Sequence, residues 1–145
     1  MPGLRGILFK YWDPLGTVTD AIRQCQLYDL RSEAAVEESL FQHLNRKLKG
    51  IDVRRQYPHD RVKADILIEE YVAIEIKLNL RTTAEFQRLI GQLETYARWG
   101  VLMIVLIVGE ADDDLKCRIE ERLIKDWGDE NNVRLIHIAG PDVPE

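Results

Sequence analysis

The stretch VKADILIEEYVAIEIKL, residues 62–78, decides the fold, because it contains two strand-like runs joined by a very short connection. Apolar and polar residues alternate in both runs, as expected for strands with two different faces, and a hairpin is the natural join. Parity places Asp65 on one face of the first run, and Glu75 and Lys77 on one face of the second. The opposite faces are apolar, with Val62, Ala64, Ile66 and Ile68 in the first run and Val72, Ile74 and Ile76 in the second.

The two acids share a face in only one kind of register. If Asp65 lies roughly across from Glu75, the connection around Glu70 must have an odd number of residues, since a two-residue turn would put the acids on opposite faces. Two converging carboxylates repel each other and stay ionised together when a cation lies between them. Mg²⁺ takes oxygen ligands and keeps several waters, so two carboxylates and one backbone carbonyl suffice. Lys77 on the same face can hold a water or stabilise charge on a phosphate.

The remaining sequence predicts helices and strands around this hairpin. The run 101–108 is continuously apolar, which indicates a strand buried on both faces. Ser32 can cap one helix and Thr82 or Thr83 another. We expect helices at about 33–49, 83–99 and 112–127, strands at 51–57, 62–69, 71–78, 101–108 and 133–138, irregular chain at 1–16, and a short helix at about 19–30.

The order α-β-β-β-α-β-α-β predicts an α/β fold, with a mixed sheet and helices on both faces. Antiparallel strands come first, and a right-handed crossover makes the last two strands parallel. We expect a core domain at 32–140, preceded at 1–31 by an arm or short helix that packs on it. Residues 141–145 are expected to form a tail.

Composition limits the functional classes. The 145 residues fit one domain, and the net charge of −5 argues against non-specific electrostatic binding to nucleic acid, although a local basic patch is compatible with it. The apolar stretch near the N-terminus is too short for a signal peptide, and the longest apolar run is too short to span a bilayer. We therefore expect a soluble cytoplasmic protein, in which Cys25 and Cys117 are reduced thiols.

The motifs resemble those of a known superfamily. Asp65, followed about ten residues later by Glu75-Ile76-Lys77, resembles the PD-(D/E)XK nuclease superfamily, whose members have the restriction-endonuclease-like fold. In the helix expected at 83–99, Gln92 and Tyr96 resemble the Gln-x-x-x-Tyr motif of RecB-like members. The resemblance covers about residues 33–108 by motif order, and it departs from the family pattern at Ala64, where that pattern has proline.

The resemblance implies a divalent-metal-dependent nuclease that hydrolyses phosphodiester bonds in DNA, with Mg²⁺ or Mn²⁺ as cofactor. It further implies nucleic acid as the partner, DNA rather than RNA, and a homodimer as one arrangement. In this resemblance Asp65, Glu75 and the Ile76 carbonyl bind the metal ion. Lys77 orients or activates the attacking water. Gln92 contacts that lysine or a phosphate, and Tyr96 supports this contact.

A glutamate of the helix expected at 33–49 would complete the site. By helical angle, Glu33 and Glu37 fall within the apolar stripe of that helix, whereas Glu38 points away. A carboxylate on the buried side of a helix is costly unless it has a partner, and support of a metal site would supply one. We therefore favour Glu37, and Glu33 after it.

Basic residues near the hairpin could bind phosphate groups. The candidates are Arg55, Arg61, Lys63, Arg81 and Arg88, although scattered solubilising charge explains them equally well. The three histidines, His43, His59 and His137, lack metal-ligand spacing and are expected at the surface or as satisfied core residues, and the tryptophans Trp12, Trp99 and Trp127 are expected to pack.

Two alternatives to an active nuclease remain. The chain could be a catalytically inactive nuclease-fold domain that binds DNA or a protein partner in a repair, restriction or defence assembly. It could also be an unrelated α/β ligand-binding module, in which Asp65 and Glu75 point apart and are ordinary polar residues.

Overall fold

The computed structural model describes residues 4–27 and 29–139. A five-stranded sheet lies at the centre, with neighbouring strands in the order β1-β2-β3-β4-β5. The first three strands pair antiparallel, and β3, β4 and β5 pair parallel. The strands are β1 (Val53–His59), β2 (Val62–Ile68), β3 (Val72–Leu80), β4 (Leu102–Ala111) and β5 (Val133–Ile138). This arrangement confirms the predicted mixed α/β sheet and the parallel pairing of its last two strands.

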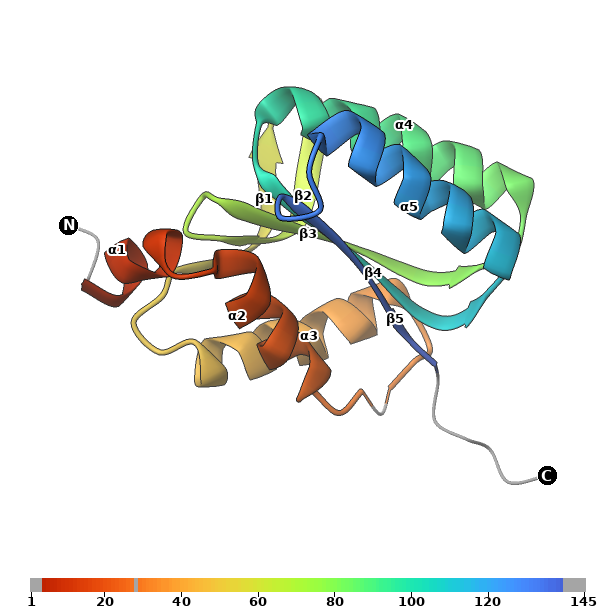
Figure 1. Cartoon of the computed structure of the whole chain (residues 1–145). Helices are drawn as coiled ribbons and strands as arrows, with labels where there is room; N and C mark the ends of the chain where they lie inside the picture. The colour runs from red at the N-terminus through yellow and green to blue at the C-terminus, as the bar shows by residue number, and fades with distance from the viewer. Residues whose placement is uncertain (1–3, 28, 140–145) are drawn as a thin grey trace.

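Helices cover both faces of the sheet (Figure 1). On one face lie α2 (Pro14–Arg23) and α3 (Glu33–Lys47), and on the other lie α4 (Thr83–Trp99) and α5 (Asp113–Trp127). The first core cluster joins Val36 and Leu40 of α3 to Ile66, Ile74 and Ile104 of the sheet. The second cluster joins Leu89, Leu93 and Ile119 of the helices to Leu67 and Val105. Because β4 contributes to both clusters, it is buried on both faces as its apolar run predicts.

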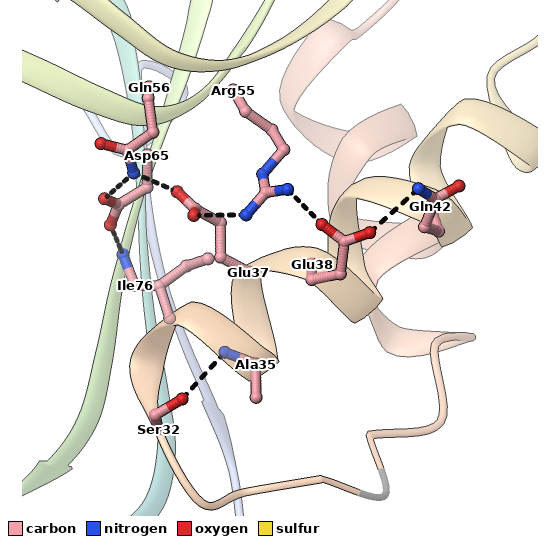
Figure 2. A network of polar contacts seen from close by, with 9 residues as sticks. All are labelled: Ser32, Ala35, Glu37, Glu38, Gln42, Arg55, Gln56, Asp65 and Ile76. Carbon is pink, nitrogen blue, oxygen red and sulfur yellow. Dashed lines mark hydrogen bonds and ion pairs between the residues drawn. The ribbon is translucent and has the colours of Figure 1, made fainter.

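Side-chain caps set the starts of two helices that carry candidate site residues. Ser32 caps α3 by accepting a hydrogen bond from the Ala35 N–H at 3.1 Å (Figure 2). Thr82 and Glu85 form a reciprocal capping box at the start of α4, which ends at Gly100. Both caps were predicted, and at α4 the structure selects Thr82 over Thr83.

The N-terminal segment differs from its prediction. Irregular chain was expected at 1–16, but α1 (Leu4–Tyr11) is helical, and α2 begins and ends earlier than the helix expected at about 19–30. The prediction was wrong because Pro14 and its neighbouring glycines were read as helix breakers. Pro14 instead occupies the first turn of α2, where its missing N–H costs nothing, and Asp13 accepts from the Gly16 N–H. The tail expected at 141–145 lies outside the described residues.

Both helices of this segment contribute to the first cluster, through Phe9, Leu15, Val18 and Ile22. Trp12, between the two helices, is 80% exposed, so the prediction that it packs was wrong. Within the described chain, no helix has the length and apolar character needed to cross a membrane.

The other aromatic and histidine predictions are confirmed. Trp127 donates its indole N–H to the Val101 carbonyl at 2.8 Å, and Trp99 stacks on neighbouring rings. The Nε2 atom of His43 lies 2.7 Å from the Ala21 carbonyl, and that of His137 lies 2.8 Å from the Gly109 carbonyl. Cys25 and Cys117 are free thiols.

The hairpin of β1 and β2 changes faces halfway along its length. Its ladder pairs Arg55 with Ile66 and Tyr57 with Ala64, so Gln56 and Asp65 lie across from each other between these pairs. Gln56 has a positive φ of 49°, which turns the strand. Consequently Val62 and Ala64 pack in the second cluster, whereas Ile66 and Ile68 pack in the first. The prediction that these four residues share one face was therefore wrong.

Candidate active site

The candidate site lies where β2 separates from β3. The two strands pair at Ile66 with Ile74, at Leu67 with Ala73 and at Ile68 with Val72, and the three residues 69–71 connect them. This odd connection puts Asp65 across from Glu75, as the parity argument requires. The two side chains nevertheless do not share one face, because Asp65 lines a pocket with Glu33 and Glu37 of α3 whereas Glu75 contacts Tyr96 of α4. Paired residues end at Ile66 and Ile74, so the two acids are the first opposing residues beyond the ladder.

Asp65 takes over a hydrogen bond that the ladder no longer makes. Its Oδ2 accepts from the Ile76 backbone N–H at 2.8 Å, and its Oδ1 accepts from the Gln56 amide at 3.4 Å (Figure 2). Because the N–H and C=O of one strand residue point the same way, the Ile76 carbonyl also faces the opening between β2 and β3. Burial raises the pKa of Asp65 to about 6, and the carboxylates of Glu37 and Glu33 act in the same direction.

Glu75 is 4% exposed and points toward α4. Its Oε2 lies 2.7 Å from the Tyr96 hydroxyl oxygen, which also lies 3.0 Å from the Lys63 carbonyl oxygen. Burial, and then the charge of Asp65, raise the pKa of Glu75 to about 8. One hydroxyl proton cannot serve two acceptors equally, but a protonated Glu75 can donate to Tyr96 while Tyr96 donates to the carbonyl of Lys63. The metal-free site at neutral pH is therefore suited to a protonated Glu75.

Lys77 is directed toward the start of α3. Its side chain is 14% exposed, and its Nζ lies 3.9 Å from Glu33 Oε1. The same carboxylate oxygen accepts the backbone N–H of Leu78 at 3.1 Å. Glu33 is thus hydrogen-bonded to the segment of β3 that carries Lys77. The ion pair between Glu33 and Lys77 keeps the ammonium group near the opening between β2 and β3.

Glu37 is the buried acid that α3 contributes to the site, and it is 6% exposed. Its carboxylate pairs with Arg55 at 2.9 Å and accepts from the Gln56 amide, which also donates to Asp65 (Figure 2). Glu38 points outward, where it pairs with the other terminal nitrogen of Arg55. This arrangement agrees with the helical-angle argument that placed Glu37 inward and Glu38 outward.

The roles of two members of this network were not predicted from the sequence. Arg55 was a candidate for phosphate binding, but both of its terminal nitrogens are bonded to carboxylates. The inward position of Glu37 could have indicated a need for such a cation, because a buried carboxylate needs a charged or hydrogen-bonding partner. Gln56 carries no comparable sequence signal, since its role depends on the turn that its positive φ introduces.

Gln92 and Tyr96 lie one turn apart on α4. The Gln92 amide oxygen is buried and has no hydrogen-bond partner among the described residues. Gln92 therefore does not accept a hydrogen bond from Lys77 here, which was one of the two contacts that the resemblance implied, the other being a substrate phosphate. It retains an unsatisfied acceptor on the helix whose Tyr96 contacts Glu75.

The donor set suits Mg²⁺ or Mn²⁺ better than Zn²⁺. Asp65, Glu75 and the Ile76 carbonyl offer only oxygen atoms, which match the preference of hard cations. Glu33, Ala34, Glu37, Gln56 and Asp65 line an adjoining pocket of about 190 Å³. In residues 4–27 and 29–139, however, no three His, Cys, Asp or Glu side chains are grouped closely enough to ligate one ion. Waters and the backbone carbonyl would have to complete the coordination.

The remaining basic candidates differ in their surroundings. Arg61, Lys63 and Arg88 are exposed, and their side chains make no ion pair within the part of the chain that the structure describes. Arg81 pairs with Glu110 at 3.3 Å. The structure therefore leaves Arg61, Lys63 and Arg88 as the candidates with unpaired charge.

No family model matches this chain, and no curated protein matches it in sequence. Among solved structures, the chain is similar to Pyrococcus furiosus SfsA in complex with Ca²⁺, with 17% sequence identity and a TM-score of 0.44. The match covers 73% of this chain and 59% of that one, so this chain spans less than two thirds of the SfsA chain. A likeness this distant assigns neither a family nor a residue role.

Proposed function

We propose that this chain is a divalent-metal-dependent nuclease of the PD-(D/E)XK type that hydrolyses phosphodiester bonds in DNA. The observation that carries the proposal is the placement of Asp65 and Glu75 across from each other where β2 leaves β3, with Lys77 two residues further along β3. The sequence order of these three residues agrees with the resemblance to that superfamily. DNA rather than RNA, and a homodimer, rest on the resemblance alone.

In this proposal Asp65, Glu75 and the Ile76 carbonyl hold the metal ion. A bound Mg²⁺ would neutralise charge on the phosphate and activate the attacking water. Lys77 provides a fixed positive charge beside the developing negative charge, and its pairing with Glu33 keeps it at the opening. Tyr96 fixes the orientation of Glu75. The unpaired amide oxygen of Gln92 would accept a hydrogen bond from the Lys77 ammonium or from a water.

Glu37 acts through its neighbours in this scheme. Arg55 neutralises it, and Gln56 bridges its carboxylate and that of Asp65. Because the bridge involves one amide group, movement of Glu37 would change the hydrogen bonding of Asp65. Glu37 is therefore proposed as a positioning residue rather than as a metal ligand.

A second candidate is an inactive domain of the same fold that binds DNA or a protein partner. Two observations favour it: within residues 4–27 and 29–139 no group of three ligating side chains is present, and Arg55 already neutralises Glu37. A domain of this kind needs neither a bound metal nor an ionised Glu75.

Cleavage assays separate the two candidates. Single- and double-stranded DNA is incubated with Mg²⁺ or Mn²⁺ and wild-type, Lys77→Ala or Asp65→Ala protein, with Lys125→Ala on the exposed side of α5 as the control. We expect both site variants to lose at least about 100-fold in rate, and the control to keep the wild-type rate. Activity that survives both changes would exclude this site. Absence of Mg²⁺ binding at millimolar concentration in calorimetry would favour the inactive domain.

A further inference from the structure

A stack of aromatic rings leads outward from the candidate active site. Tyr96, which contacts Glu75, has its ring centroid 6.3 Å from that of Trp99, with 17° between the ring planes. The His59 ring lies on Trp99 at 4.2 Å and 4°. Tyr57 stacks against Trp99 at 6.3 Å and 12°. The nearly parallel rings thus connect Glu75 to His59, the last residue of β1 at the tip of the β1–β2 hairpin.

Exposure increases along this stack. Tyr96 is fully buried and Trp99 is half-buried, but His59 is exposed although one face of its ring lies on Trp99. The stack therefore ends at the surface with a flat, supported ring. A planar group that already rests on another ring loses little freedom when a further planar group stacks on it.

Exposed basic residues lie close to His59 along the chain and along α4, although Lys63 alternates to the face of the hairpin opposite His59 and Val62. Arg61 and Lys63 belong to the same hairpin as His59, and Arg98 precedes Trp99 at the end of α4. All three side chains are exposed, and within the described residues none of them makes an ion pair or side-chain hydrogen bond. Cations beside an aromatic platform in a chain of net charge −5 indicate a local site for an anionic ligand with planar groups.

We propose that the ring of His59, supported by Trp99, is a stacking subsite for unpaired bases, with Arg61 and Arg98 contacting the adjacent phosphates. This inference rests on the proposed nuclease function, and it makes single-stranded nucleic acid the substrate class. In a duplex the faces of the bases are covered by their neighbours, whereas every base of a single strand offers a face for stacking. The contiguous path from His59 to Glu75 places this subsite beside the candidate active site.

Metal-free binding assays test the subsite without cleavage. A fluorescent oligothymidylate, an abasic oligomer of equal length and a duplex of equal length are titrated by anisotropy. We expect the oligothymidylate to bind most tightly. The change His59→Ala should weaken its binding about 5- to 150-fold and leave abasic binding unchanged, because only stacking is lost. His59→Phe should retain the affinity. Arg61→Gln with Arg98→Gln should weaken the binding of both single strands and reduce the salt dependence of binding.

A matched control is available in the same chain. Trp12 is an exposed aromatic residue between α1 and α2, and Lys10 of α1 lies 6.0 Å from the Tyr71 ring in the β2–β3 connection. Because this connection is at the opposite end of β2 from His59, Trp12→Ala should leave oligothymidylate affinity unchanged. The subsite is refuted if His59→Phe weakens binding as much as His59→Ala, if the abasic oligomer binds as tightly as the oligothymidylate, or if the duplex binds as tightly.

The two proposals fail in different ways. If the base-dependent binding is observed but no metal-dependent cleavage occurs, the stacking subsite stands and the nuclease proposal fails. If cleavage depends on Lys77 but single strands and duplexes are cut equally and His59→Ala leaves KM unchanged, the nuclease stands and the stacking subsite fails. Should His59→Ala not fold, the comparison of wild-type affinities for oligothymidylate and the abasic oligomer decides the question.

Discussion

Replacing Glu75 by glutamine should stabilise the metal-free protein at alkaline pH. In the folded chain, burial and the neighbouring charge of Asp65 raise the pKa of Glu75 from its ordinary 4.5 to about 8. Between these two pH values the folded protein holds a proton that the unfolded chain has lost. The free energy of unfolding must therefore fall as the pH rises from about 4.5 to about 8, and then level off.

The size of this loss follows from the pKa difference. Each pKa unit corresponds to about 1.36 kcal/mol, so a rise from 4.5 to about 8 gives an upper limit of about 5 kcal/mol. Glu75 is almost completely buried, so solvent screens little of the effect. A glutamine has nearly the same shape, can still hydrogen-bond to Tyr96 and never ionises. The variant should match the wild type near pH 5 and exceed it by several kcal/mol near pH 9, within that limit.

Urea unfolding followed by circular dichroism, in EDTA and at several pH values between about 5 and 9, measures this difference. Glu120→Gln, at an exposed position of α5, is the control for removal of an acid and should follow the wild-type curve. Added Mg²⁺ should stabilise the wild type more at high pH, because binding must displace the protons, and should have little effect on the Glu75→Gln variant. Parallel pH dependences for wild type and Glu75→Gln would refute the reasoning.

Further substitutions test three other features of the structure. Tyr96→Phe removes the hydroxyl that orients Glu75 and should lower Mg²⁺ affinity about 10- to 100-fold in calorimetry; an unchanged affinity would contradict that role. Arg55→Met leaves Glu37 without its cation and should lower the free energy of unfolding by about 2–4 kcal/mol. Adding Glu37→Gln should recover part of this loss, whereas strictly additive effects would contradict the coupling. Gly109→Ala should destabilise by about 1–3 kcal/mol, because φ is 98° and the new Cβ would lie 2.4 Å from Asn79 Oδ1. Gly91→Ala in α4 has open space and should stabilise by about 0.5–1 kcal/mol, so equal signs for the two glycine changes in thermal unfolding would refute the argument.

Local sequence signals predicted the elements that they control. The helix Thr83–Trp99 was predicted with its observed bounds, because Thr82 or Thr83 can cap its start and Gly100 follows its last residue. The run 101–108 was predicted as a buried strand from its continuous apolar character, although β4 extends to Ala111. The register that sets Asp65 across from Glu75 was also predictable, because it requires an odd number of connecting residues, and residues 69–71 are three.

Features that depend on tertiary contacts were not predictable in this way. Pro58 was expected to follow the first strand, yet β1 continues through it to His59, because an edge strand tolerates a residue without an N–H. The change of faces depends on the positive φ of Gln56, which glutamine does not favour locally. The pairing of Arg55 with Glu37 requires α3 to lie over β1, and no spacing along the chain encodes that approach.

The change of faces at Gln56 and Asp65 gives the β1–β2 hairpin a place in both hydrophobic layers. Residues on one side of the crossover pack with α3, and residues on the other side pack with α4. Loss of packing in either layer therefore destabilises the β1–β2 hairpin, and the hairpin also contributes packing contacts to the other layer. The two halves of the molecule should consequently unfold together in one cooperative transition, with neither layer surviving alone as a partly folded intermediate.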